Sequence, residues 1–382
     1  MDLDSHDEHR ERARAFAERE VLGSVGARDR ESRWDGALFR RLGDAGLLGA
    51  VVPRALGGGD LCASDVSRML IGFGEGAGDA GLALAWTAHS FGCAAPIQRF
   101  GTEAQRQRYL SPLARGEWVG AFAHREPEAA ADPIGIRTRA EKRGGRWILR
   151  GSKTWVVNGS IGDVFVVTAV TDPLRRKEGI STFLVERDAP GLVRGRRTET
   201  LGMRTAVISE ITFDDCEVPE DSLLGPEGSG LLDVCPLVRR WERACLLAPW
   251  IGFMRTLLDQ SIREARERFQ LGKPVGHFQS TRATLADMRI RIELCQRIQA
   301  RAAWQLDRGD SAGDRDIAVA CLLLTHSVAQ VTQDALRIHG AHGLEVDRLT
   351  ERLYRDAAVI GSLGEGIDVL RSVIAGSLLD LG

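Results

Sequence analysis

The residues of this 382-residue chain that could do chemistry lie in short motifs spread along its length. In chain order the motifs are Glu126-Pro127 with Asp132, Lys153-Thr154-Trp155-Val156-Val157-Asn158-Gly159, Arg268-Phe269-Gln270-Leu271-Gly272-Lys273-Pro274, Phe278-Gln279, His339-Gly340-Ala341-His342-Gly343 and Tyr354-Arg355-Asp356-Ala357. Arginine guanidinium groups suit phosphate, and small residues such as those at 340–343 permit a close backbone approach. No single motif is decisive, so their order and separation carry the information.

In this order and at these separations, the motifs resemble those of the FAD-dependent acyl-CoA dehydrogenase family, most closely its isovaleryl-CoA branch. The resemblance extends from residues 42–49 through Ala88-His89-Ser90 to residues 373–375. It implies that a glutamate takes a proton from Cα of an acyl thioester while hydride leaves Cβ for flavin N5. The product is then a trans-2-enoyl thioester.

The resemblance also implies which glutamate is the base. In much of the family the base lies nine residues beyond the arginine of the Arg-Asp-Ala motif, and here that position is Gly364, which cannot act as a base. The isovaleryl-CoA and long-chain branches instead carry it in a Glu-Arg pair before an apolar run, which implies Glu242. A one-residue slip in the loop would make Glu365 the base. The main-chain N–H of Gly364 remains a donor for the thioester oxygen.

A glutamate beside an arginine on a helix, taken alone, is more often a solvated ion pair. With the family pattern, Arg243 is expected to contact substrate together with Glu242. Leu363 lies where the isovaleryl-CoA branch has glycine, which indicates an acyl group of different shape. The thioester could be carried by coenzyme A or by a carrier protein, since both present the same phosphopantetheine arm.

For FAD, the resemblance implies that residues 123–132 and 155–157 line the isoalloxazine ring, with Trp155 covering one face. Arg268 corresponds to the family arginine that meets the FAD diphosphate of a neighbouring subunit. The remaining adenosine-side contacts are expected from Leu271, Gln279, Arg337, Gly340 and Gly343. Sharing FAD in this way implies a homotetramer built as a pair of dimers, with an electron acceptor such as an electron-transfer flavoprotein.

Several positions depart from the family pattern. Arg125 stands where a Ser or Thr is usual, Ala131 lacks the hydroxyl expected near the diphosphate, and Val157 cannot donate to flavin N5. Arg337 replaces a usual Gln. Each lost contact is worth about 1 kcal/mol, so FAD is expected to bind more loosely or to react differently. Two alternatives follow, a flavin-dependent monooxygenase on the same fold and a non-catalytic binder of acyl thioesters.

The composition of the chain limits which classes of partner it is expected to bind and where in the cell it is expected to lie. A net charge of -2 and a pI near 6.5 give no excess of positive charge that would favour binding to nucleic acid or to an anionic membrane. The 7 cysteines include no C-x-x-C pair, and His339 and His342 have no nearby Cys or carboxylate set, so neither disulfides nor a metal site is expected. No apolar stretch approaches the roughly 18 residues that span a bilayer. The cytoplasm is the expected location.

The elements that must position these residues fall into three regions of an α+β fold. Helical spacing predicts an N-terminal all-α domain over residues 1–119 and a four-helix bundle over 228–382, where an apolar stripe runs from Leu285 to Leu306. Residues 120–227 alternate like strands, with a hairpin turn at Gly144-Gly145, and predict an antiparallel β-barrel-like domain. Gly76 to Gly81 matches G-x-G-x-x-G, but no strand precedes it, so a turn between helices is expected.

Overall fold

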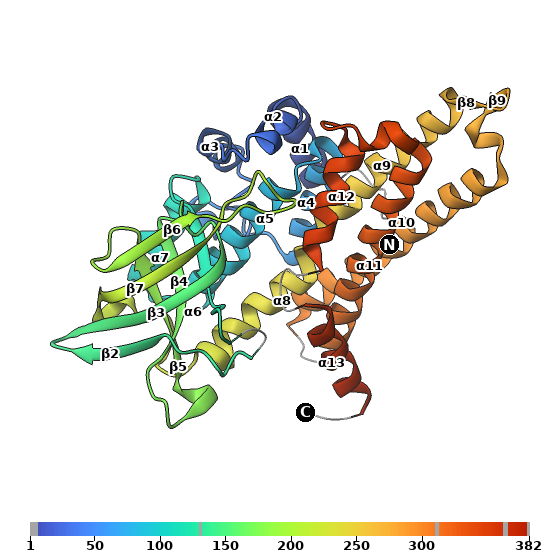
Figure 1. Cartoon of the computed structure of the whole chain (residues 1–382). Helices are drawn as coiled ribbons and strands as arrows, with labels where there is room; N and C mark the ends of the chain where they lie inside the picture. The colour runs from blue at the N-terminus through green and yellow to red at the C-terminus, as the bar shows by residue number, and fades with distance from the viewer. Residues whose placement is uncertain (1–6, 130–131, 310–312, 362–365, 380–382) are drawn as a thin grey trace.

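The computed structural model describes residues 7–129, 132–309, 313–361 and 366–379. Along the chain it has a helical region, a sheet and a second helical region (Figure 1). This arrangement confirms the α+β fold with three regions. None of the described helices is both long and apolar enough to cross a membrane.

The N-terminal region is built from helices around one apolar core. They are α1 (Glu8–Phe16), α2 (Val25–Arg30), α3 (Gly36–Asp44), α4 (Ala63–Ala77), α5 (Ala80–His89), α6 (Ala95–Phe100) and α7 (Glu103–Ala114), with the short helical turns η1 (Ala17–Val21), η2 (Arg54–Leu56) and η3 (Ser90–Ala94). The glycine-rich segment joins α4 to α5, with Gly78 at φ 62°. Asp79 then caps α5 by accepting from Leu82 N at 2.9 Å and pairs with buried Arg28 at 2.8 Å. The segment is a helix-helix turn, as expected.

The middle region is a curled seven-stranded sheet (Figure 1). Its strands are β1 (Gly120–Ala123), β2 (Arg139–Arg143), β3 (Arg146–Val157), β4 (Val164–Val170), β5 (Ile180–Glu186), β6 (Leu192–Arg197) and β7 (Ile208–Pro219), in the order β1-β4-β2-β3-β7-β6 with β5 paired to β4. Gly144 and Gly145, at φ 56° and 77°, form the β2–β3 turn. The sheet is mixed rather than purely antiparallel, because β1 pairs with β4 in parallel.

The C-terminal region returns to helices. It contains α8 (Cys235–Cys245), α9 (Ala248–Glu267), α10 (Gln279–Arg308), α11 (Asp314–His339), α12 (Leu349–Ile360) and α13 (Ile367–Leu378), together with the hairpin strands β8 (Phe269–Gln270) and β9 (Lys273–Pro274) and the turn η9 (Gly340–Leu344). The apolar stripe of α10 is buried from Met288 to Ala302 and half-buried at its ends, Leu285 and Leu306. Its one polar member, Gln299, donates to Ser67 Oγ at 3.0 Å and to the carbonyl of Ala244, so the stripe also joins α10 to α4 and α8.

Polar side chains at the joints between the three regions hold them together. Asn158 Nδ2 donates to Ala85 O at 2.9 Å and to Gly120 O at 3.0 Å, which fastens the end of β3 to α5. Arg355 pairs with Asp29 at 2.6 Å, which ties α12 to the N-terminal helices. The sequence motifs around Asn158 and Arg355 therefore also stabilise the packing of the three regions against one another.

His89 forms a further joint and must be neutral to do so. Its Nδ1 accepts from Gly120 N at 3.0 Å, and its Nε2 contacts Leu113 O at 3.1 Å, where it acts as the donor. Burial lowers the pKa of His89 to about 4, although the Leu113 carbonyl opposes the shift. The joint between α5, α7 and β1 thus depends on one imidazole tautomer.

This arrangement predicts a pH dependence of stability. Because the folded pKa of His89 lies below the ordinary value of 6.5, unfolded chains bind a proton that folded chains refuse as the pH falls from 6.5 towards 4. The stability advantage of the wild type over His89→Gln should shrink by about 2 kcal/mol between pH 7 and pH 5. Urea unfolding at each pH measures it. The exposed His326→Gln control should follow the wild type, and a constant His89→Gln difference would contradict the prediction.

Candidate functional site

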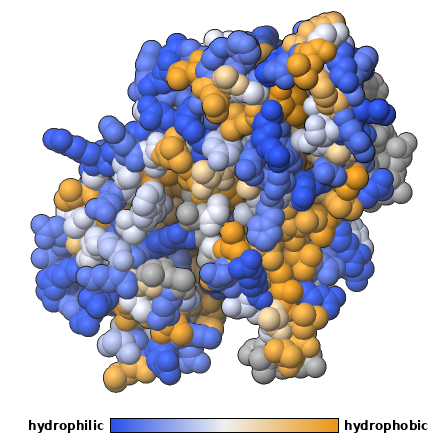
Figure 2. Space-filling model, turned by 45° about the vertical axis from the view of Figure 1, so that its right-hand side comes forward, coloured by the Kyte–Doolittle hydropathy of each residue, from blue (hydrophilic) through white to orange (hydrophobic). Residues whose placement is uncertain are grey.

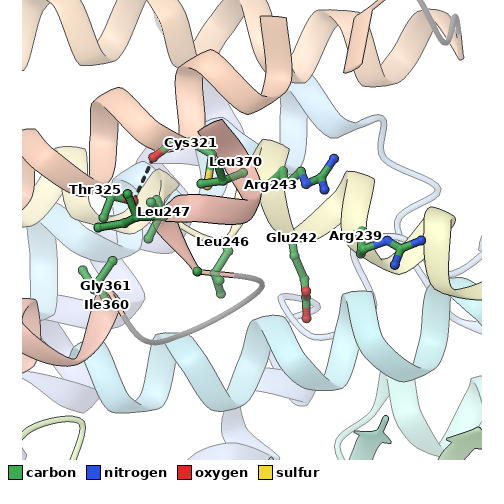
Figure 3. Close-up of a pocket in the computed structure, with 12 residues that line it drawn as sticks. Arg239, Glu242, Arg243, Leu246, Leu247, Cys321, Thr325, Ile360, Gly361 and Leu370 are labelled. Carbon is green, nitrogen blue, oxygen red and sulfur yellow. Dashed lines mark hydrogen bonds between the residues drawn. The ribbon is translucent and has the colours of Figure 1, made fainter. Parts of the chain in front are cut away.

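An open pocket, called the cavity below, lies between α8, α11, the end of α12 and α13 (Figure 3). It is lined by Arg239, Glu242, Arg243, Leu246, Leu247, Cys321, Thr325, Ile360, Gly361, Gly366, Ile367 and Leu370. Most of these side chains are apolar, and the charged ones all come from α8. Figure 2 shows the surface notched between the lobe that holds the sheet and the lower, α13 end of the helical lobe, where apolar surface is exposed.

Glu242 lies in the wall of this cavity because of how α8 is packed. Trp241 stacks on Phe91 with ring centroids 5.0 Å apart, and Ala244 and Cys245 are buried in the core. These contacts turn the other side of the helix, with its i, i+3, i+4 and i+7 positions from Arg239 onward, to the cavity. In Figure 3 the carboxylate of Glu242 is directed away from the guanidinium group of Arg239. Glu242 is half-buried.

Three of the expected substrate-side residues, Leu363, Gly364 and Glu365, lie outside the described residues. The residues that flank them, Gly361 and Gly366, both line the cavity with Glu242. The two ends of the loop that was expected to carry the thioester-oxygen donor therefore open onto the same space as the expected base.

The segment expected to line the flavin ring is held by a buried ion pair. Lys153 Nζ lies 2.6 Å from Glu126 Oε1 and also donates to Thr168 Oγ1 at 3.2 Å. Glu126 further accepts from the backbone N–H groups of Arg137 and Thr138 at 2.5 and 3.1 Å. Burial lowers the pKa of Lys153 to about 8 despite the opposing charge of Glu126. Burial works to raise the pKa of Glu126, but Lys153 and the hydrogen bonds from Thr138 and Arg137 together lower it.

Trp155 sits on a strained backbone next to this segment. Its φ of 53° is unusual for a bulky residue, and it lies in a β-bulge of β3 between the inward-facing Lys153 and Val156. The indole is 55% exposed, so it is not a core aromatic. Thr154 N donates to Arg125 O at 2.9 Å, which sets the segment beside the bulge. Strain of this kind persists where the surrounding structure enforces it and clusters at functional sites.

His124 connects the segment to the cavity helix. Its Nδ1 lies 3.1 Å from Thr168 Oγ1 and 3.8 Å from Cys235 Sγ in the first turn of α8. Burial lowers the pKa of His124 to about 3, assisted by the charges of Lys153, Arg239 and Arg125. Because Arg239 also lines the cavity, the end of β1 and the face of α8 that carries Glu242 lie side by side.

The adenosine-side residues gather at a different place. Arg268 donates to His339 O at 2.9 Å, at the C-terminal end of α11, and a side chain at Gly340 would lie 2.7 Å from the Arg268 guanidinium. Arg337 and Gln279 are exposed, Gly343 is buried, and Leu271 is 91% exposed at the tip of the β8–β9 hairpin. Figure 1 shows this hairpin at the end of the α9–α10 pair remote from the sheet.

These surroundings fit FAD in two separate halves. One half offers an open indole face at Trp155, the apolar Val157 and the cation of Arg125 for a flavin ring. The other offers guanidinium groups and glycines for the diphosphate and adenosine. The expected hydroxyl donors are missing at Arg125 and Val157, and Ala131 lies outside the described residues. The first half belongs to the middle region of the chain and the second to its C-terminal helices.

Comparison with known proteins establishes the family. The family models for the acyl-CoA dehydrogenase N-terminal, middle and C-terminal domains match residues 4–117, 121–216 and 239–379. The chain belongs to the acyl-CoA dehydrogenase family. Its expected enzyme class, an oxidoreductase, is thereby confirmed.

Individual relatives of this acyl-CoA dehydrogenase family member act on thioesters of two kinds. The chain is 37% identical to an L-prolyl-[peptidyl-carrier protein] dehydrogenase of Pseudomonas fluorescens over 88% of each chain. It is 33% identical to the mitochondrial isovaleryl-CoA dehydrogenase of Pongo abelii, over 88% of this chain and 79% of the relative. The solved structure of PigA with FAD and proline matches all of both chains with a TM-score of 0.95 at 29% identity. The expected cofactor, FAD, agrees with this relative.

Sequence patterns alone missed three contributors to the site. Arg239 was missed although it lies one helical turn before Glu242 and Arg243, a spacing that could have indicated it. Lys153 is one of only 4 lysines in an arginine-rich chain, which was a signal that arginine could not serve there. The contact of His124 with α8 joins residues more than 100 positions apart, and no local pattern encodes it.

The buried Lys153–Glu126 pair predicts that two neighbouring carboxylates, Glu126 and Glu128, contribute very differently to the stability of the protein. Glu126→Gln leaves a buried ammonium without its counter-charge and should destabilise the protein by about 3 kcal/mol. Glu128→Gln removes only an exposed pair with Arg137 and should cost less than about 1 kcal/mol. Thermal unfolding of the FAD-loaded variants measures both. Equal effects of the two substitutions would show that the pair does not hold the segment.

Proposed function

We propose that this protein is an FAD-dependent dehydrogenase that removes hydrogen from Cα and Cβ of an acyl thioester, with Glu242 as the base. The observation that carries the proposal is the position of Glu242. Its carboxylate lines a largely apolar cavity on the face of α8 that lies beside the expected ring-lining segment. A carboxylate on one side of the substrate and the ring on the other is what the reaction needs.

The chain's own residues supply orientation and proton transfer. Glu242 takes the Cα proton, and Leu246, Leu247 and Ile360 limit the access of water to the reacting carbons. FAD, when bound, accepts the hydride from Cβ. Arg243 and Arg239 place positive charge in the same wall, where it favours the charge that develops on the thioester oxygen.

We further propose a thioester carried on the phosphopantetheine arm of a carrier protein, with prolyl as the first candidate acyl group. The similarity to a prolyl-carrier-protein dehydrogenase and to PigA solved with FAD and proline supports it. For a prolyl ring, loss of hydrogen from Cα and Cβ gives a ring double bond, so the trans geometry of open-chain enoyl products does not apply.

The proposed assembly is a homotetramer that passes electrons to an electron-transfer flavoprotein or a similar acceptor. Large apolar side chains exposed on the two outlying elements support an assembly of several chains: Phe269 and Leu271 on the β8–β9 hairpin and Leu378 and Leu379 at the end of α13. The expected FAD contacts also fall into two groups, one in the middle region and one on the C-terminal helices, and this division supports sharing of the cofactor between subunits.

The role of Glu242 predicts a selective loss of the chemical step. Glu242→Gln keeps the size and shape of the side chain but removes the base, and should slow anaerobic flavin bleaching by a thioester about 10³-fold. Glu365→Gln is the matched control and should bleach at nearly the wild-type rate. Stopped-flow absorbance of the flavin measures both. The reverse pattern would transfer the base to Glu365.

The proposed substrate predicts a ranking of thioesters. Prolyl-loaded carrier protein should bleach the flavin at least tenfold faster than butyryl-CoA or isovaleryl-CoA at equal concentrations. If only the CoA thioesters react, the carrier-protein proposal is wrong while dehydrogenation stands. If no thioester bleaches the flavin and the protein consumes oxygen when given reduced flavin, the monooxygenase alternative replaces the proposed function.

A further inference from the structure

We infer that Arg125 places a fixed positive charge against the flavin ring and makes bound FAD easier to reduce. The inference rests on FAD binding at the proposed site and needs no particular substrate. It assigns a role to a residue that stands where the family pattern has a small hydroxyl side chain.

The backbone around Arg125 is held from both sides. Its carbonyl accepts from Thr154 N at 2.9 Å, and the next residue, Glu126, is anchored by Lys153 and two backbone N–H groups. The side chain therefore leaves a rigid segment next to the bulge that carries Trp155. A charge on such a support is preorganised, and little energy is spent on reorienting it when the ring changes charge.

The guanidinium of Arg125 keeps its charge available. Within residues 7–129, 132–309, 313–361 and 366–379 it makes no ion pair and donates no hydrogen bond. The carboxylate nearest in sequence, Glu126, is already committed to Lys153. Arg125 is only half-buried, so water can solvate its guanidinium group until a ligand covers it.

The neighbouring groups do not cancel this charge. His124 is neutral, because burial and the nearby cations lower its pKa to about 3. Val157 has no polar group, so it cannot offer the ring a hydrogen bond in place of the charge. A cation beside a ring partly shielded from water interacts more strongly with it than in bulk solvent.

The chemistry gives the direction of the effect. A hydride adds two electrons and one proton to the oxidised ring, so the reduced ring gains one negative charge. A nearby cation stabilises that state over the neutral oxidised one and raises the reduction potential. Sulfite adds reversibly through its own electron pair and also leaves negative charge on the ring, so its dissociation constant reports the same stabilisation without any substrate.

The test compares FAD-loaded wild-type protein with Arg125→Gln, Arg125→Ser and Arg125→Lys. The Ser variant restores the residue type of the family pattern, so it should retain FAD while losing the charge. We expect the sulfite dissociation constant to rise at least tenfold in the Gln and Ser variants. The two-electron potential should fall by the equivalent of a tenfold change, about 30 mV. The Lys variant should stay within about threefold of the wild type.

Arg146→Gln is the matched control, because Arg146 lies at the far, exposed end of β3. It should change neither quantity. The inference is overturned if the Gln and Ser variants keep the wild-type sulfite affinity and potential, or if Arg146→Gln shifts them equally. It is also overturned if only the affinity for FAD changes, since Arg125 would then contact another part of the cofactor.

This outcome is separable from that of the proposed function, because neither sulfite binding nor the potential involves a thioester. If the potential responds to Arg125 but no thioester reduces the flavin, the inference about Arg125 stands and the proposed dehydrogenase function is wrong. If a thioester reduces the flavin but the potential does not respond to Arg125, the proposed function stands and the inference about Arg125 is wrong.

Discussion

The buried ion pair between Lys153 and Glu126 is the constraint on which the rest of the site depends. It joins the middle of β3 to the segment after β1, and Glu126 extends the connection to the backbone at residues 137 and 138. Burying two charges is costly, and the cost is offset only because the carboxylate is also hydrogen-bonded. The pair thus orders a segment that has little apolar surface of its own, and with it Arg125 and the strained Trp155.

The cavity helix is positioned by a different kind of contact. Trp241 stacks on Phe91 and the small residues Ala244 and Cys245 fill the core, so apolar packing decides which face of α8 carries Glu242. The contact between Cys235 and His124 then brings this face beside the ordered segment. An ion pair orders the segment after β1, whereas apolar packing orders the helix that carries Glu242, and the two adjoin at the contact between His124 and Cys235.

The cofactor surroundings differ from the family pattern in a consistent direction. Hydroxyl donors are replaced by an arginine and a valine, so directional hydrogen bonds to the ring are exchanged for charge and apolar contact. Charge acts over a longer range and without strict geometry. Such a site would hold FAD with fewer specific bonds while changing how readily it accepts electrons.

The sequence by itself determined the three-region fold, the family and the position of the Glu-Arg pair, because helical and strand periodicities and ordered motifs are local properties of the chain. It also indicated correctly that residues 76–81 form a turn between helices. Only the tertiary structure decided that Lys153 pairs with Glu126, that Arg239 lines the cavity, and that His124 contacts α8. Those facts depend on contacts between residues far apart in sequence, and neither periodicity nor spacing encodes which distant side chains meet.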